Sequence, residues 1–266
     1  MELNLTHKHV LITGGSRGIG LACAKVFLEE GCKVSLVSRD PNNLEKAKTL
    51  LSSQVAGCQD RIALFSAELQ KADSAERALN EAEKTFGAID VLVNSAGAAK
   101  RTPAESLSPA FFREAMDAKF FTYINMIDPV IKRMGARGEG VIVNVVGAGG
   151  KIPSTVHIAG GSANAALMLT TAGLAVAYGP KGVRINAVNP AGTLTDRLIE
   201  GLKVNADHEN ISPEEVLERM TSKIPMGRLA NPEEVADTVA YLASNRASYV
   251  TGTVITMDGA AHPVVV

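Results

Sequence analysis

The sequence has no tryptophan, and aromatic residues make up only 4% of its 266 residues. Cysteine is also scarce. The three thiols, Cys23, Cys32 and Cys58, have neither the spacing of metal ligands nor the even number of a disulfide framework. We therefore expect no metal site, and reduced cysteines of the kind found in cytoplasmic proteins. The formal net charge is -1, so charge does not point to nucleic acid or to an anionic membrane surface as a partner.

Long apolar runs are missing as well. No stretch approaches the ~20 apolar residues that cross a bilayer, and the start, MELNLTHKHV, lacks the basic region and apolar core of a signal peptide. We therefore expect no membrane span. The chain does contain 46% hydrophobic and 21% charged residues, which is typical of a globular protein with a sizeable core. No linker or shift in composition divides it, so residues 1–266 are expected to form a single domain.

Short β-branched runs alternate with helical patterns along the whole chain. The runs predict strands at 9–13, 33–38, 61–66, 87–94, 140–146, 183–188 and 253–257. Helical periodicity lies between them, at 21–28, 43–52, 74–85, 108–134 and 162–178. Because the strands are apolar on both faces, they are expected to form a parallel sheet with helices on both sides. This arrangement is a doubly wound α/β fold with right-handed crossovers.

The segment Leu11–Gly20, LITGGSRGIG, joins the first strand to the first helix. Gly14 can turn where a Cβ would clash, Gly18 lets the backbone approach a ligand, and Gly20 lets the helix pack on its strand. The N–H groups and the positive dipole end of the helix attract an anion. Taken alone, the motif fits either a phosphate-binding turn or an ordinary tight turn of an α/β protein.

Further motifs occur in the same order as in one known family. The segments are Thr13–Gly20, Asn94–Gly97, Asn189–Thr195, Pro225–Arg228, Pro232–Ala236 and Thr251–Gly259. Together they resemble the short-chain dehydrogenase/reductase family over nearly the whole chain. The resemblance implies a Rossmann-type sheet of seven strands, a nicotinamide dinucleotide as cofactor and a small-molecule substrate. It also implies a homotetramer or a homodimer.

The same resemblance implies a set of cofactor contacts. The set comprises a phosphate turn of Gly14, Ser16, Arg17, Gly18, Ile19 and Gly20, an adenine border at Glu68 and Leu69, a ribose wall of Asn94, Ala96 and Gly97, and carboxamide contacts from Pro190, Thr193 and Thr195.

The residues after the second strand favour NADP(H) over NAD(H). An acidic side chain at the strand end would bind a free ribose 2′-hydroxyl and repel a 2′-phosphate. The chain instead has Ser38 and Arg39 there, with Arg17 in the glycine turn. Two guanidinium groups favour a phosphate through charge-assisted hydrogen bonds. Asp40 is the opposing observation, and we expect it to lie one residue too far along to meet the ribose. A second interpretation, in which Arg39 is only a solvated turn residue, stays open.

The positions that carry the chemistry of the family hold other residues here. Family members use a Ser, a Tyr-x-x-x-Lys pair and an Asn, and in register these positions hold Gly147, Gly160, Asn164 and Lys119. Neither glycine has a side chain that donates a proton. Asn164 can still hydrogen-bond the nicotinamide ribose, without the charge of a lysine, and Lys119 can supply a cation from a neighbouring helix. A plain helix role for Lys119, with a packed stem and a solvated amine, is equally open.

His157 is the candidate proton donor. It lies seven residues before Asn164, and enoyl reductases of the same superfamily have their Tyr seven residues before their Lys. An imidazole with a pKa of ~6.5 suits proton transfer near neutrality. The alternative is a loop histidine without a catalytic role. Ser162 is expected to cap a helix that begins at Ala163.

Residues 191–226 form a long irregular stretch after a strand end, where ligands bind in open α/β sheets. They are predicted to form a substrate lid, with a plain surface excursion as the alternative.

The sequence is compatible with two functions. The first is an NADP(H)-dependent oxidoreductase of the short-chain type, which acts on a small carbonyl, alcohol or activated double bond with a non-standard active site. The second is an NADP(H)-binding protein without dehydrogenase activity, such as a sensor, a scaffold or an inactive homologue.

Overall fold

A parallel sheet of seven strands runs through the computed structural model, which describes residues 2–97, 100–196, 198–199, 202, 206 and 210–263. The strands are β1 (His9–Thr13), β2 (Lys33–Ser38), β3 (Ile62–Ser66), β4 (Val91–Asn94), β5 (Gly140–Val145), β6 (Val183–Pro190) and β7 (Val254–Met257). Their order is β3-β2-β1-β4-β5-β6-β7, and every pairing is parallel. The predicted doubly wound α/β fold is therefore confirmed.

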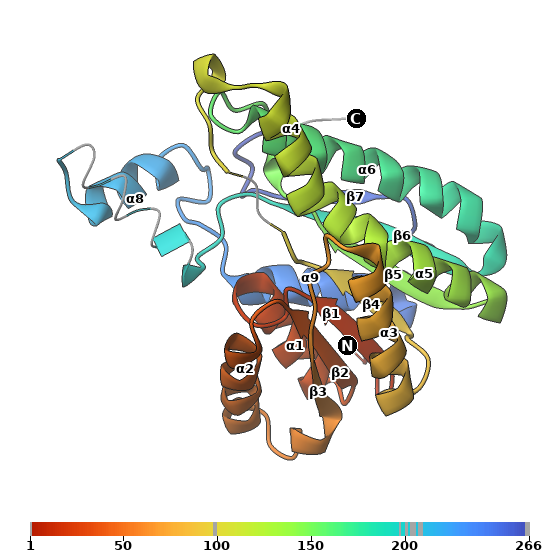
Figure 1. The fold of residues 1–266 in the computed structure, drawn as a ribbon. Helices are drawn as coiled ribbons and strands as arrows, with labels where there is room; N and C mark the ends of the chain where they lie inside the picture. The colour runs from red at the N-terminus through yellow and green to blue at the C-terminus, as the bar shows by residue number, and fades with distance from the viewer. Residues whose placement is uncertain are drawn as a thin grey trace.

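Helices cover both faces of this sheet (Figure 1). One face carries α1 (Gly18–Glu29), α2 (Pro41–Gln54) and α9 (Pro232–Ala243), and the other carries α3 (Ala72–Phe86), α5 (Thr122–Arg137) and α6 (Ile158–Tyr178). Successive side chains of a strand point to opposite faces. Val10 and Ile12 of β1 therefore pack with α1 and α9, whereas Leu11 packs with α3 and α5. The two layers explain why the strands are apolar on both sides.

The helix expected over 108–134 is three elements. A short α4 (Pro109–Ala115) leads into a π-helical turn (Met116–Phe121), and α5 follows. The hydroxyl of Thr122 donates to the carbonyl oxygen of Asp117, five residues earlier, which matches the wider π spacing. A π turn changes the direction of the side chains that it contains. Lys119 lies in this turn, so its placement does not follow from helical periodicity.

Helix α6 begins at Ile158, earlier than expected, and Ser162 is not its cap. The hydroxyl of Ser162 donates to the carbonyl oxygen of Ile158 inside the first turn, and His157 is the residue that precedes the helix. The reason is the packing of the turn Ala148–Gly150. A Cβ on Gly161 would lie 2.6 Å from the carbonyl oxygen of Gly149, so the missing side chain lets the first turn of α6 lie directly on that loop.

The segment Ile158–Lys181 also corrects the expectation that no stretch is long and apolar enough to span a membrane. Among the described residues, it alone passes a test of length and hydropathy for a span. Half of the tested window is buried inside the protein. Core helices pass the same test, so this finding is weak evidence for a membrane span.

Candidate active site

The glycine turn after β1 is shaped by two close backbone contacts. Gly14 has a φ of +68°, and a Cβ there would lie 2.8 Å from the backbone of Ala96, after β4. A Cβ on Gly20 would lie 2.3 Å from the carbonyl oxygen of Gly14. The turn is fastened to β2 by the N–H of Gly14, which donates to the carbonyl oxygen of Val37 at 2.8 Å. The first N–H groups of α1, from Gly18 and Ile19 onward, begin directly beyond this turn.

The loop after β6 reaches across to the same turn. A Cβ on Gly18 would lie 3.4 Å from Cγ2 of Thr195, in ordinary van der Waals contact, and the φ of +57° favours glycine there. Pro190 ends β6 and is buried, and Thr193 pairs with Ala230 in a parallel bridge. The structure thus brings Thr195 to the start of α1, although it lies 177 positions after Gly18 in sequence.

Two exposed arginines each follow one member of a bonded serine pair. Arg39 follows Ser38 at the end of β2, and Arg17 follows Ser16 before α1. The hydroxyl of Ser16 donates to that of Ser38 at 3.0 Å. Asp40 has another task. Its carboxylate accepts hydrogen bonds from the backbone N–H of Asn42 and the side-chain amide of Asn43, which caps α2.

Asn94 holds the ends of three strands together. Its amide accepts from the hydroxyl of Thr13 on β1 and donates to the side-chain oxygen of Asn144 on β5 at 3.0 Å. Asn144 in turn donates to the hydroxyl of Thr171 on α6. All four side chains are buried. Because the amide of Asn94 is engaged in this chain, a contact to a ribose at this position would fall to the backbone nearby.

The remaining expected adenine and ribose residues lie on loops after strand ends. Glu68 is exposed and forms an ion pair with Lys71, whereas Leu69 is buried and its carbonyl oxygen accepts from Asn125. Ala96 is half-buried, and Gly97 is exposed with a φ of +124°. These residues follow β3 and β4, so they border the same edge of the sheet as the glycine turn.

The ammonium group of Lys119 lies at the end of β5. It donates to the carbonyl oxygen of Val145 at 3.0 Å and to the hydroxyl of Tyr123 at 2.7 Å. The stem of Lys119 lies against the end of β4, because a Cβ on Gly97 would be 3.0 Å from its Cδ. The structure therefore places this cation between the carboxyl ends of two neighbouring strands.

Two glycines after β5, Gly147 and Gly149, leave space for the side chains of His157 and Asn164. A Cβ on Gly149 would lie 3.0 Å from Cδ2 of His157 and 3.7 Å from Nδ2 of Asn164. A Cβ on Gly147 would lie 3.3 Å from the same amide nitrogen. The missing side chains leave the space that the ring and the amide occupy. Asn164 is buried, and its Oδ1 has no hydrogen-bond partner among the described residues.

Comparison with known proteins agrees with this geometry. The sequence model of a family described as Enoyl-(Acyl carrier protein) reductase matches residues 14–262. The chain belongs to the short-chain dehydrogenase/reductase family. The peroxisomal 2,4-dienoyl-CoA reductase of Pongo abelii is 34% identical over 262 residues, which cover 97% of this chain and 84% of the relative.

Solved structures of the short-chain dehydrogenase/reductase type superpose closely on the chain. L-sorbose reductase from Gluconobacter frateurii, in complex with NADPH and L-sorbose, has a TM-score of 0.93 at 25% identity and covers all of both chains. A short-chain oxidoreductase from Pseudomonas aeruginosa PAO1, NADPH-bound and described as containing an atypical catalytic center, has a TM-score of 0.86 at 26% identity. It covers 97% of this chain and 98% of its own.

Relative to the family motifs, two features of the site were not expected from sequence. Tyr123 contacts Lys119, and because Lys119 lies in the π turn this contact does not follow from α-helical spacing. Asn189, at the end of β6, is fully buried, and neither atom of its amide has a partner among the described residues. No sequence signal distinguishes it from a solvated asparagine.

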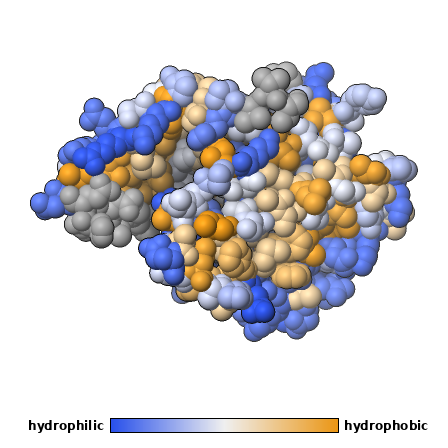
Figure 2. All heavy atoms as spheres, turned by 90° about the horizontal axis from the view of Figure 1, so that it is seen from above, coloured by the Kyte–Doolittle hydropathy of each residue, from blue (hydrophilic) through white to orange (hydrophobic). Residues whose placement is uncertain are grey.

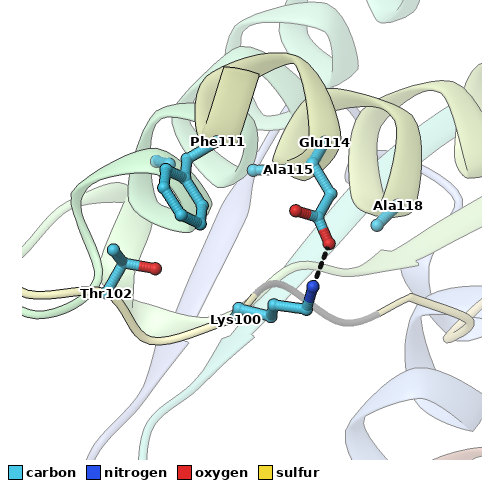
Figure 3. Close-up of a pocket in the computed structure, with 7 residues that line it drawn as sticks. Lys100, Thr102, Phe111, Glu114, Ala115 and Ala118 are labelled. Carbon is cyan, nitrogen blue, oxygen red and sulfur yellow. Dashed lines mark ion pairs between the residues drawn. The ribbon is translucent and has the colours of Figure 1, made fainter. Parts of the chain in front are cut away.

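A small hollow opens beside the candidate residues (Figure 3). Phe111, Glu114 and Ala115 of α4 form one wall, and Lys100 and Thr102 face them from the loop after β4. The ammonium of Lys100 pairs with the carboxylate of Glu114 at 2.6 Å across the hollow. Ala118 and Ala159 complete the lining, and they neighbour Lys119 and Gly160 in sequence.

Proposed function

We propose that the protein is an NADP(H)-dependent oxidoreductase that acts on a small carbonyl, alcohol or activated double bond through a non-standard active site. One observation carries the proposal: Oδ1 of Asn164 is a buried acceptor with no hydrogen-bond partner in the described part of the chain, and it lies beside the ring of His157. A buried acceptor without a donor costs free energy. A site built to receive a donor, such as a ribose hydroxyl, accounts for that cost.

The phosphate side of the crevice supports a dinucleotide. The N-terminus of α1 presents N–H groups and its positive dipole end beyond the turn formed by Gly14, Gly18 and Gly20. In this proposal Ser16, Arg17 and Ile19 complete the turn, and Thr193, Thr195 and Pro190 hold the carboxamide. Glu68 and Leu69 would border the adenine, and the backbone around Asn94, Ala96 and Gly97 the ribose.

The choice of NADP(H) rests on the end of β2. Arg39 and Arg17 are exposed and flank the bonded pair Ser16 and Ser38. Asp40, the acid that would oppose a 2′-phosphate, is occupied with the cap of α2. Two guanidinium groups without a competing carboxylate favour a phosphate over a hydroxyl. The NADPH complexes of two structural relatives are consistent with this choice.

The reacting end is assigned to His157, Asn164 and Lys119. The bound cofactor would supply or accept the hydride. His157 would hold and deliver the proton at the substrate, and Asn164 would orient the nicotinamide ribose through its buried Oδ1. Lys119 would supply the positive charge that Asn164 lacks. In register with the family, lysine and asparagine stand in each other's positions here, while Gly147 and Gly160 hold no proton donor.

We also propose that residues 191–226 form a substrate lid. The part of it within the described residues includes α8 (Pro213–Thr221), which stands apart from the sheet (Figure 1), and a small apolar cluster of Leu202, Ala206 and Val216. Residues 197, 200, 201, 203–205 and 207–209 lie outside the described residues. Backbone hydrogen bonds from Leu194 to Ala230 and from Met226 to Gly259 fasten both ends of the stretch to the body.

We also propose that the protein forms a homotetramer or a homodimer and is located in the cytoplasm. Leu169 and Val176 on the outer side of α6 are 76% and 80% exposed. Figure 2 shows apolar surface gathered on the half of the molecule that holds α6, away from the hydrophilic projection of α8. A subunit contact would cover such a surface. Cys23, Cys32 and Cys58 are all free and buried, which is consistent with a reducing compartment.

The experiment has two stages. Calorimetric titration of the protein with NADPH, NADP+, NADH and NAD+ comes first, and failure of all four to bind would overturn the proposal. Turnover of carbonyl, alcohol and enone substrates follows, with His157→Ala and, as a control, His262→Ala at an exposed position far along the chain. Loss of the proton donor should lower kcat/KM by about 10²–10⁴-fold, without a change in cofactor affinity. Tight NADPH binding with no turnover of any substrate would instead support the binding protein without dehydrogenase activity.

A further inference from the structure

Two hydrogen-bond acceptors at the end of β5 and in α5 hold the ammonium of Lys119. Its ammonium donates to the hydroxyl of Tyr123 at 2.7 Å and to the carbonyl oxygen of Val145 at 3.0 Å. The hydroxyl of Tyr123 donates to the same carbonyl oxygen at 2.5 Å. Because the phenolic proton is directed to Val145, the oxygen lone pairs of Tyr123 are left to accept from the ammonium. The ammonium also lies 4.4 Å from the centre of the Tyr123 ring.

The surroundings keep this tyrosine in one chemical form. Tyr123 is fully buried in the core between the sheet and α5. Burial raises the pKa of its phenol, so the group stays neutral and remains a donor to Val145. A neutral phenol can donate one hydrogen bond and accept another, which is what the geometry requires of it.

The stem of the lysine is fixed as well. A Cβ on Gly97 would lie 2.9 Å from the carbonyl oxygen of Ala118 and 3.0 Å from Cδ of Lys119, so the end of β4 lies against the π turn and the stem. A lysine usually keeps much rotamer freedom at its flexible four-carbon stem. Here the stem, the ammonium and the aromatic ring each have a fixed neighbour.

We propose that Tyr123 is a positioning residue that fixes the ammonium of Lys119 at the carboxyl ends of β4 and β5. The use of that cation in catalysis rests on the proposed function, whereas the role of the tyrosine rests on the geometry alone. A cation that is already fixed stabilises negative charge on a substrate oxygen without rearrangement in the reaction. The π turn matters because it directs Lys119 toward Val145.

The test is made on the protein without cofactor, by NMR of lysine labelled at its ε position. The measured quantities are the hydrogen exchange of the Lys119 ammonium and the pKa of that group, with Lys119→Arg for assignment. Tyr123→Phe keeps the ring and removes the hydroxyl. Tyr178→Phe is the matched control. The ammonium of Lys181 lies 4.8 Å from the centre of the Tyr178 ring, so this variant tests the loss of a hydroxyl at a second lysine–tyrosine pair.

We expect a protected ammonium at Lys119 in the wild type. In Tyr123→Phe its exchange should become faster by about tenfold or more, since a hydrogen bond to a charged group is lost. Its pKa should also fall, because that bond favours the charged form. Lys181 should be unaffected by Tyr178→Phe. Where a substrate is turned over, kcat should fall in Tyr123→Phe and fall further in Lys119→Met, which removes the cation itself.

Two results would overturn the inference. One is an exchange rate and a pKa of Lys119 that do not change in Tyr123→Phe. The other is a wild-type Lys119 ammonium that exchanges as fast as that of Lys181, a comparison that decides the matter even if Tyr123→Phe does not fold. Neither result depends on a dinucleotide, so failure here is distinct from a failure to bind NADPH, which would overturn the proposed function.

Discussion

Asp40 caps helix α2 through the backbone N–H of Asn42, which donates to its Oδ1 at 2.8 Å. The other carboxylate oxygen accepts from the side-chain amide of Asn43 at 2.9 Å. The carboxylate is therefore directed to the helix start. Its neighbour Arg39 is exposed at the end of β2. Two adjacent charged residues thus have separate tasks, one in folding and one available for a ligand.

Replacement of the arginine should change the choice of cofactor. Arg39→Ala is expected to weaken NADPH binding by about ten- to a hundredfold, since charge-assisted hydrogen bonds to the 2′-phosphate are lost. NADH binding should stay nearly constant. Calorimetry measures both affinities. The control is Asp40→Asn, which keeps a capping side chain and removes the charge. A shift in NADPH preference in Asp40→Asn would contradict the separation of tasks.

Lys119 and Asn164 offer a test of exchanged positions. Lys119→Asn and Asn164→Lys should each lower kcat/KM, because one removes the cation and the other places a second cation in the same site. The double variant restores one lysine and one asparagine. If the two losses were independent, the relative kcat/KM of the double variant would equal the product of the relative values of the single variants. We expect it to be higher, by a coupling free energy of about 0.5–3 kcal/mol, because the two residues act together. Effects that multiply without coupling would show that the two positions act independently.

Because His9 is buried, we expect the free energy of unfolding to fall in mild acid. Its Nδ1 lies 2.8 Å from the carbonyl oxygen of Gly87, which can only accept, so Nε2 accepts from the hydroxyl of Ser35 at 2.8 Å. Burial lowers the pKa of His9 from its ordinary value of 6.5. Below pH 6.5 the unfolded chain therefore binds a proton that the folded chain does not, and folding becomes less favourable.

The measurement for His9 is the free energy of unfolding in urea between pH 8 and pH 5. In the wild type it should be constant above about pH 7.5 and fall below about pH 6.5. His9→Gln carries no titrating group at this position, so its own decline over the same range should be smaller. Equal pH dependence of the two proteins would mean that His9 contributes nothing to acid sensitivity.

Two glycines of α6 should respond in opposite ways to alanine. A Cβ on Gly161 would lie 2.6 Å from the carbonyl oxygen of Gly149, so Gly161→Ala should cost about 1–3 kcal/mol of unfolding free energy through overpacking. Gly173 has nothing within 4 Å of its Cβ position. Gly173→Ala should stabilise the protein by about 0.5–1 kcal/mol, as in an open helix interior. Urea unfolding of both variants checks the difference in sign.

Much of the fold could be predicted because its signals are local. Strand periodicity, the apolar strands and the glycine turn each lie within a few residues, and they yielded the sheet and a helix after the turn, which begins at Gly18 and not at residue 21. The helix over 108–134 was predicted wrongly as one element, because a π turn depends on contacts with the ends of β4 and β5. The start of α6 was also wrong, because packing on Gly149 decided it.

The sequence by itself determined the order of the elements, the family, and the residue types at the proposed reacting positions, such as His157 and Asn164. Tertiary structure decided how those residues are used. It directed the carboxylate of Asp40 to α2, buried the side-chain oxygen of Asn164 with no partner among the residues that the structure describes, and joined Lys119 to Tyr123 and Val145. Propensity and spacing act over a few residues, whereas these contacts depend on distances between separate strands and helices, which only the packed sheet establishes.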